Sequence, residues 1–224
     1  MSEVVDQFMK LVLNALRHAN HYYTRRAEEF LNKMGAKGNI IVSNYRPPIS
    51  QCGLACSMGV GGVGVIFIER SFFEDKRIPE ELKEFIIAHE LVHIVRSHVV
   101  PTILTRMLFQ LFSKALRETI DSVLKSKELP EAVVGIALSL FWLYGSLELV
   151  KTDAELIRAQ ELEADSLAVQ LTSCNGARYF IELLRVLKEW GHDVSHEALL
   201  GFPALTIGER IDNLQRLCSI SPSS

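Results

Sequence analysis

The sequence predicts an α+β fold that is mainly α, in which a small β-sheet comes before a central helix and the remainder of the chain is helical. Apolar runs of strand type occur at 39–43 and 65–68, whereas apolar residues at helical spacing recur through most of the chain after residue 79. A length of 224 residues favours one domain over 1–224. Because 48% of the residues are apolar, the chain can bury a sizeable core and can also contact lipid.

The N-terminal segment is expected to form an amphipathic helix, because its apolar residues between Val5 and Leu16 follow the helical period. Glu3 and Asp6 are acidic, and no long apolar stretch leads to a cleavage site. The segment is therefore not interpreted as a secretion signal, and a cytoplasmic location is expected. The net charge of −3 indicates no nucleic-acid partner.

The sheet is expected to come from the segments between the first helix and the central helix. After a turn near Met34-Gly35, a strand is predicted at 39–43, and a loop with Pro47-Pro48 follows it. The glycine-rich segment 59–64 is interpreted as a flexible connection that leads to a strand at 65–68.

The central helix is predicted to run from about Pro79 to His98. Pro79 occupies the first helical position, and Glu80 and Glu81 place acidic groups in the first turn, both of which are typical of a helix start. The residues at 82–95 are apolar on nearly every side, which indicates a buried helix.

This buried helix carries the pattern H-E-x-x-H from His89 to His93. Side chains four residues apart lie about 40° from each other around a helix, so both imidazoles can bind one metal ion, with Glu90 beside it. A zinc hydrolase needs such histidines to hold zinc and such a carboxylate to take a proton from water. The alternative is a pair of core histidines that are hydrogen-bonded to carboxylates. His98 lies about 140° from His93, so a capping or core-edge role is expected for it.

Five further helices are predicted after the central helix. They span Thr102–Lys125, Glu131–Val150, Asp153–Leu171, Ala177–Trp190 and Thr206–Leu217. A polar break at 151–153 is interpreted as separating the helix Glu131–Val150 from the helix Asp153–Leu171. Asn175-Gly176 is interpreted as ending the latter helix.

The run Ala132–Leu147 contains no charged residue. As a helix it would extend about 24 Å, which is less than the roughly 30 Å of a bilayer's hydrocarbon core. A helix in the core or in a dimer interface is the favoured interpretation, and membrane insertion or attachment is the alternative.

A zinc hydrolase site needs a third protein ligand, and the segment Glu161–Asp165 offers carboxylates for it. Glu161 and Asp165 lie on one face of a helix, whereas Glu163 points about 200° away from Glu161. One helix can therefore supply a ligand and, one turn later, a carboxylate that accepts the N–H of a ligand histidine. The alternative is a solvated charged face.

HELVHIVRSH at 89–98 and ELEAD at 161–165 resemble the zinc metallopeptidases of the HtpX and CaaX-prenyl-protease type, within the gluzincins. The resemblance covers about residues 5–217 and implies a zincin-like metallopeptidase domain. It implies that His89, His93 and Glu161 bind one zinc ion per chain. It also implies that Glu90 is the general base and that Asp165 is the partner behind the ligands.

The stretch GLACSMGVGGVGVIFIERSFF resembles the segment before the family's active-site helix, where an edge strand holds substrate in extended form. The resemblance implies that Val63–Ile68 pairs with the peptide. Two positions depart from the family pattern: Cys52 replaces an asparagine, and Phe202 replaces a histidine. Arg210 corresponds to an arginine that helps to bind the substrate carbonyl, and a surface or helix-pairing role is the alternative.

The remaining cysteines and histidines show no ligand spacing. Free thiols are the default for the cysteines, and a Cys174–Cys218 disulfide is left open. The histidines outside the motif are interpreted as surface residues, with His196 an outside candidate for stabilising a transition state; they are His18, His21, His192 and His196.

The sequence therefore predicts a zinc-dependent endopeptidase that acts on protein or peptide substrates. Residues 99–150 are interpreted as a helical insertion between the two ligand motifs, with 102–150 contacting a membrane or a second copy. If it contacts a membrane, the catalytic site is expected to face the cytoplasm. One alternative is a deformylase-like zinc amidohydrolase with a cysteine ligand near Gly53–Cys56. The other is a latent or non-catalytic zinc-binding helical protein.

Overall fold

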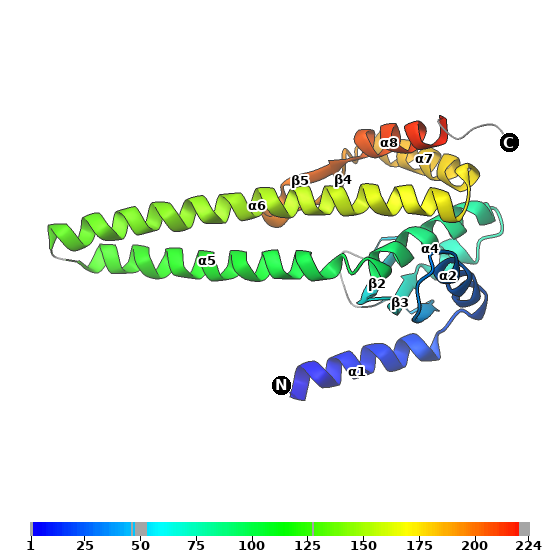
Figure 1. Cartoon of the computed structure of the whole chain (residues 1–224), viewed down its shortest axis with the longest axis horizontal. Coiled ribbons are helices and arrows are strands. Elements are labelled where there is room, and N and C mark those ends of the chain that lie inside the picture. The colour runs from blue at the N-terminus through cyan, green and yellow to red at the C-terminus, as the bar shows by residue number, and fades with distance from the viewer. Residues whose placement is uncertain (1, 46, 48–52, 127, 220–224) are drawn as a thin grey trace. The chain divides into compact units, whose positions relative to one another are not determined.

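The computed structural model describes residues 2–45, 47, 53–126 and 128–219, and it confirms a mainly helical α+β fold with a small mixed sheet (Figure 1). The chain divides into two compact units. The first unit comprises Met1–Val99, Gln160–Asp193 and Ile207–Ser224, and the second comprises Val100–Ala159 and Val194–Thr206. The interpretation of 1–224 as one domain with an insertion at 99–150 stays a prediction.

The N-terminal part of the first unit contains two helices, α1 (Ser2–Arg17) and α2 (His21–Lys33), where the sequence predicted one. Asn20 separates them, because its backbone is extended and its side chain accepts a hydrogen bond from the Tyr23 amide at 3.2 Å. An asparagine in this position satisfies an otherwise unpaired amide at a helix start.

The sheet of the first unit has three strands in the order β1-β3-β2. β1 (Asn39–Ser43) is parallel to β3 (Val63–Ile68), and β2 (Ala55–Val60) is antiparallel to it. The expectation that Val63–Ile68 is an edge strand is therefore wrong, because β3 is paired on both sides. β2, which the sequence analysis did not predict, lies at an edge.

The glycine-rich segment between β2 and β3 is a tight hairpin and not the flexible connection that was expected. Gly61 and Gly62 have φ of +61° and +86°, which suits the two central positions of a type I′ turn. Gly59 and Gly64 face each other across the hairpin, and a Cβ on either would lie 3.0 Å from the Ile94 side chain. The glycines therefore let the hairpin approach the central helix closely.

The central helix α4 (Glu80–Val95) follows the short helix α3 (Arg70–Phe73) and forms the middle of the core. Phe85, Ile87 and Leu91 are fully buried, as the apolar sequence predicted. α4 ends three residues before the predicted His98, because Ser97 adopts a left-handed conformation with φ +57°.

Helix α6 (Leu129–Leu171) is continuous, so the predicted break at 151–153 is wrong. The polar side chains of this segment bond within the helix: Lys151 Nζ reaches Glu148 Oε1 at 2.8 Å, and the Thr152 hydroxyl donates to the Glu148 carbonyl at 2.9 Å. Asn175-Gly176 does not end this helix, since both residues lie in the first turn of α7 (Cys174–Glu189).

The last helix, α8 (Ile207–Ser219), packs on α7 in the first unit. A disulfide joins Cys174 to Cys218, with their Cα atoms 5.5 Å apart. The default of free thiols is therefore wrong for this pair. The crosslink ties the start of α7 to the end of α8.

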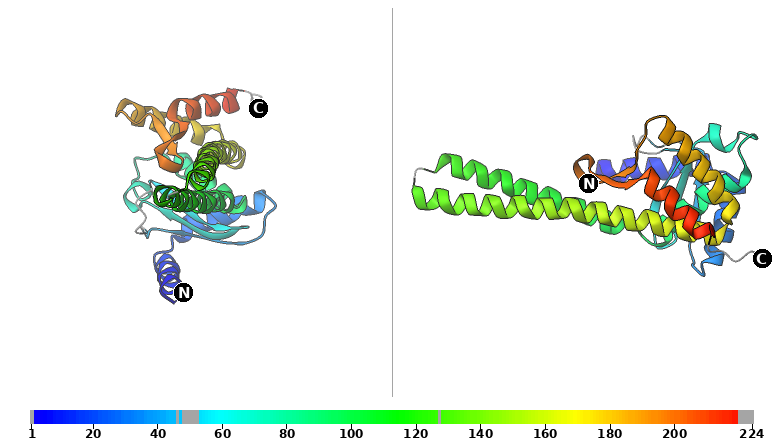
Figure 2. Two further views of the ribbon diagram at one scale, coloured as in Figure 1. Left: turned by 90° about the vertical axis from the view of Figure 1, so that its left-hand side faces the viewer. Right: turned by 90° about the horizontal axis from the view of Figure 1, so that it is seen from above.

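The second unit contains α5 (Val99–Lys125) side by side with the first part of α6 (Figure 1 and Figure 2). Small residues allow this packing: a Cβ on Gly145 would clash with the Phe112 ring, and one on Gly135 would clash with Val123. Phe112 also packs edge-to-face on Trp142 with ring centroids 5.1 Å apart.

A two-stranded hairpin completes the second unit and was not predicted from the sequence. β4 (Val194–Glu197) is antiparallel to β5 (Pro203–Thr206), with the 3-10 helix η1 (Leu199–Gly201) between them. The Leu199 amide donates to Asp153 Oδ2 at 2.9 Å, which attaches the hairpin to α6.

The charge-free run Ala132–Leu147 lies in α6 and is largely exposed, with Ser146 its one buried residue. The interpretation of this run as a helix buried in the chain's own core is therefore wrong.

Candidate metal centre

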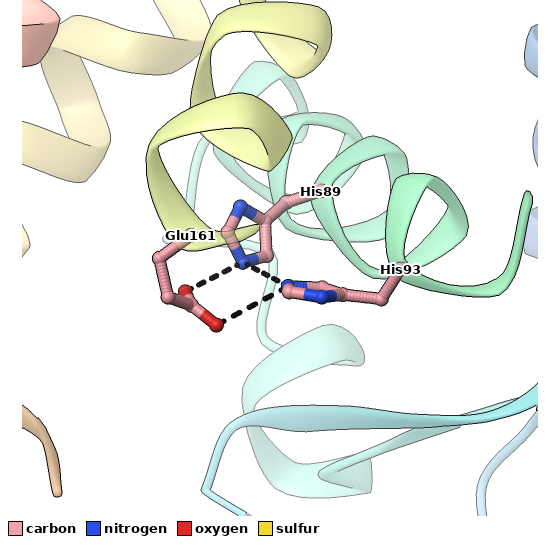
Figure 3. A group of neighbouring side chains, drawn as sticks. All are labelled: His89, His93 and Glu161. Carbon is pink, nitrogen blue, oxygen red and sulfur yellow. Dashed lines mark hydrogen bonds and ion pairs between the residues drawn. The ribbon is translucent and has the colours of Figure 1, made fainter. Parts of the chain in front are cut away.

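His89, His93 and Glu161 converge on one point (Figure 3). The two Nε2 atoms are 3.2 Å apart. Glu161 Oε2 lies 3.2 Å from His89 Nε2, and Glu161 Oε1 lies 3.3 Å from His93 Nε2. Within the described part of the chain, this is the one group of His, Cys, Asp and Glu residues close enough to hold a metal ion.

These separations fit a zinc ion. Tetrahedral coordination with zinc–ligand bonds of about 2.0 Å places neighbouring ligand atoms about 3.3 Å apart. Two imidazole nitrogens and one carboxylate oxygen form a donor set typical of catalytic zinc, which leaves a fourth position for water or substrate. The two Nε2 atoms have this separation, and each lies about this far from a different Glu161 oxygen, so the three residues fit zinc in chemistry and are close enough to bind one ion.

The three side chains are held by two helices of the first unit. α4 supplies both histidines one turn apart, and α6 supplies Glu161 from its C-terminal part. His89 and Glu161 are buried and His93 is half-buried. Both helices pack in the same core, so the convergence of the ligand atoms depends on tertiary packing.

Asp165 lies behind His89, as the sequence predicted. Its Oδ1 is 2.9 Å from His89 Nδ1, the nitrogen that faces away from Glu161. A carboxylate in this position fixes the ring orientation and keeps the proton on Nδ1, which leaves Nε2 free to bind a metal.

Arg210 is buried, so the alternative of a surface arginine is wrong. Its Nε and Nη2 donate to Asp165 Oδ2 and Oδ1 at 2.7 and 2.8 Å, and Nη2 lies 3.5 Å from Glu161 Oε2. The guanidinium also lies over the Phe180 ring, 4.8 Å from its centroid. Arg210, which lies on α8, thus holds the carboxylates of Asp165 and Glu161 on α6.

This network keeps the carboxylates ionised. Burial by itself would raise the pKa of Asp165, but the charge and hydrogen bonds of Arg210 outweigh it and lower that pKa. Burial likewise opposes ionisation of Glu161, yet hydrogen bonds with His89 and His93 hold its pKa well below the ordinary value. Two buried carboxylates are therefore available to a cation at neutral pH.

Glu90 is held by a residue that sequence reasoning missed. Ser57, on the edge strand β2, donates its hydroxyl to Glu90 Oε2 at 2.7 Å. This hydrogen bond orients the carboxylate and brings the edge of the sheet beside it. The signal that could have revealed β2 is the pair Gly61-Gly62 between two short runs, which is typical of a β-hairpin turn.

His98 caps the end of α4 with its amide, as expected, and its ring also contacts the site. Its Nδ1 lies 2.9 Å from His93 Nδ1, and its Nε2 lies 3.2 Å from Glu163 Oε2. A separation of 140° from His93 would require α4 to continue to residue 98, whereas the helix ends at Val95 and the chain turns back. His98 is not one of the three converging residues, as expected.

The other residues named from the sequence are not part of this group. His18, His21 and His192 are exposed, as expected. His196 and Phe202 belong to the second unit. Cys52 lies outside the described residues, and Cys56 is disulfide-bonded.

We predict that His89 of the metal-free protein titrates near pH 9. Burial and the charge of Arg210 lower the pKa of His89, but hydrogen bonds with Asp165 and Glu161 outweigh them and raise it from 6.5 to about 9. Zinc must then displace a proton, so zinc binding should tighten as the pH rises toward 9. NMR titration of the His89 ring tests this. The midpoint should fall in Asp165→Asn, and a midpoint near 6.5 in the unmodified protein would contradict the prediction.

Comparison with known families agrees with this geometry. The sequence profile of peptidase family M48 matches residues 54–216, which include both ligand motifs. The chain belongs to this family. No match was found among curated proteins or among solved structures.

Membership of M48 confirms the class predicted from the sequence. This M48 peptidase is a hydrolase of the zinc metallopeptidase class, and the His89, His93 and Glu161 cluster fits metal binding. Its substrates are peptides.

Proposed function

We propose that this M48 protein is an endopeptidase with one zinc ion per chain, held by His89, His93 and Glu161. The observation that carries the proposal is the set of 3.2–3.3 Å separations that join the two Nε2 atoms to each other and each Nε2 atom to one Glu161 carboxylate oxygen. The contact between Asp165 and His89 supports it, since a ligand histidine needs such a partner.

Glu90 is the proposed general base. Zinc, when bound, lowers the pKa of a water molecule to about 7 and polarises the substrate carbonyl. Glu90 accepts a proton from this water as its oxygen attacks the carbonyl carbon. Glu90 then donates the proton to the amide nitrogen as the carbon–nitrogen bond breaks. Ser57 holds the carboxylate in position for both transfers.

The edge strand β2 is the proposed binding surface for the substrate. β2 pairs with β3 on one side only among the described strands, so its other edge can add an extended peptide by backbone hydrogen bonds. Ser57 lies on this strand and contacts Glu90, so a peptide paired there would pass the catalytic carboxylate. The expected role of Val63–Ile68 thus moves to Ala55–Val60.

Arg210 is proposed first as a support for Asp165 and Glu161. Its guanidinium contacts these carboxylates, the His89 ring and the Phe180 ring. The role predicted from the family resemblance, stabilisation of the oxyanion, stays a prediction.

Zinc content and peptide cleavage together test the proposed function. We expect about one zinc per chain, hydrolysis of a fluorogenic peptide or casein that stops with a chelator, and recovery when zinc is added back. Binding of zinc without any cleavage would favour the latent or non-catalytic alternative. A thiolate signal in the cobalt-substituted protein would favour the deformylase-like alternative, although Cys56 is disulfide-bonded.

We further propose that the α5–α6 hairpin of the second unit enters a lipid bilayer and that the catalytic site faces the cytoplasm. Both helices contain a window apolar enough to cross a membrane, of which only 6% and 11% is buried. The exposed apolar side chains of α6 include Val133, Val134, Ile136, Leu138, Leu140, Phe141, Leu143, Tyr144 and Leu147. Consecutive positions point in different directions, so these side chains lie on every side of the helix except the side that packs on α5. A second copy would cover one stripe of this surface, whereas lipid covers all of it.

Membrane extraction tests this proposal. We expect the expressed protein to sediment with membranes and to resist alkaline extraction, because the apolar hairpin is more stable in lipid than in water. The double variant Leu140→Asp/Phe141→Asp should be released, whereas Trp190→Asp, which changes an exposed aromatic residue of the first unit, should not. A protein that stays in the soluble fraction as a dimer would contradict lipid contact and favour a second copy.

A further inference from the structure

We propose that His98 and Glu163 orient the ligand His93, as Asp165 orients His89. Glu163 holds the His98 ring, and the His98 ring holds the His93 ring; we call this pair the positioning relay. The inference rests on the proposed zinc site, and it assigns a role to two residues outside the ligand set. His98 Nδ1 lies 2.9 Å from His93 Nδ1, and His98 Nε2 lies 3.2 Å from Glu163 Oε2.

The end of α4 brings His98 back onto His93. The Ser97 amide donates to the Ile94 carbonyl at 3.1 Å, and the His98 amide donates to the His93 carbonyl at 3.0 Å. With Ser97 at φ +57°, this pair of bonds forms a Schellman motif, which places the second residue after the cap over the residue five positions earlier. In most Schellman motifs these two positions make an apolar contact, whereas here the contact is between the imidazole rings of His98 and His93.

The ligand geometry dictates where the protons lie. His93 Nε2 faces His89 and Glu161, so it must be unprotonated to bind a metal, and the proton of the neutral ring is then on Nδ1. His93 Nδ1–H therefore donates to His98 Nδ1. The single proton of a neutral His98 ring is then on Nε2, from which it is donated to Glu163 Oε2.

The relay is fixed at its far end. Arg96 Nε lies 3.0 Å from Glu163 Oε1, and Gln160 Nε2 donates to the His98 carbonyl at 3.0 Å. His98 is 7% exposed, so water competes little for its hydrogen bond with His93. Both nitrogens of this buried ring have hydrogen-bond partners. An apolar residue at the same position could end the helix in the same way, but it could not make these two hydrogen bonds.

Helix α6 thereby orients both ligand histidines. Asp165 contacts His89 directly, and Glu163 acts on His93 through His98. Glu161, Glu163 and Asp165 lie within five residues of one helix, so a single element supplies the third ligand and both supports. The segment that looked like a charged surface run in the sequence has a separate task for each carboxylate.

Zinc affinity of the full chain, measured by chelator competition, tests the relay. His98→Ala should weaken zinc binding about tenfold, because loss of a partner behind a ligand histidine typically costs 10–100-fold. His98→Asn, which keeps an acceptor near the position of Nδ1, should restore most of the affinity. Glu163→Gln should weaken binding roughly 3–5-fold, since it replaces a charged acceptor by a neutral one. The double variant His98→Ala/Glu163→Gln should be no weaker than His98→Ala, because Glu163 acts through His98.

Controls separate this role from a structural one. His192→Ala and Glu28→Gln change the same residue types at exposed positions and should leave zinc affinity unchanged. In nitrogen NMR of the zinc-loaded protein, the His93 Nδ1–H should exchange slowly with water, and exchange should accelerate in His98→Ala. If His98→Ala does not fold, His98→Asn and Glu163→Gln still give the expected affinity series. Zinc affinity of His98→Ala within twofold of the unmodified protein would overturn the relay, whereas an unmodified protein that binds no zinc would overturn the proposed function itself.

Discussion

Replacing Glu90 with glutamine is expected to abolish peptide hydrolysis while zinc content stays near one per chain. Glutamine has nearly the same shape as glutamate, but its amide cannot accept the proton of the attacking water. General base catalysis typically contributes 10²–10⁴-fold, so kcat should fall by about 10³-fold or more. Glu90 is not among the three converging ligand residues, so the metal site should persist.

The measurement is steady-state cleavage of a fluorogenic peptide, with zinc determined on the same sample. Glu81→Gln is the matched control, because it makes the same change at an exposed position of α4 and should retain full activity. If Glu90→Gln cleaves peptide at the unmodified rate, the proposed mechanism is wrong. If it loses zinc as well as activity, Glu90 contributes to the metal site and not only to proton transfer.

Replacing Arg210 with methionine is expected to destabilise the protein by about 3–5 kcal/mol and to weaken zinc binding. Asp165 is fully buried, and its strongest partner is the Arg210 guanidinium at 2.7 and 2.8 Å. Removal of one member of a buried ion pair costs this much in other proteins. Among the described residues, Asp165 would keep only the His89 ring, 2.9 Å away, as a partner for its buried charge. Without Arg210, burial would raise the pKa of Asp165, and the support of His89 would weaken.

Urea unfolding and chelator competition measure the two effects of Arg210→Met separately. Arg216→Met removes an exposed arginine from the same helix and should change stability by no more than about 0.5 kcal/mol. The double variant Arg210→Met/Asp165→Leu removes both buried charges, so stability should largely return. Zinc affinity should stay low in that variant, because His89 Nδ1 has lost its acceptor. Unchanged stability of Arg210→Met would show that the ion pair is not buried as described.

The proposed ligand residues were predictable because their spacing is local. H-E-x-x-H on a buried helix and two carboxylates four residues apart each follow from helix periodicity, so His89, His93, Glu161 and Asp165 could be named before the structure. The structure then placed His89 within hydrogen-bonding distance of His93, Glu161 and Asp165.

The supports of the site were harder to predict because they depend on where elements end and how they pair. One left-handed residue, Ser97, ends α4 and turns His98 onto His93. One tight turn at Gly61-Gly62 makes the glycine-rich segment a hairpin, which creates β2 and places Ser57 beside Glu90.

By itself the sequence determined the helical character of the chain, the buried central helix and the zinc chemistry of its motif, because all three depend on residues within a few positions of one another. Only the tertiary structure decided that β2 lies at an edge of the sheet, that Arg210 is a buried partner of Asp165 and that Glu163 reaches His98. Each of these contacts joins residues more than 40 positions apart or depends on strand order. Local periodicity does not encode such contacts, because they arise from the packing of whole elements.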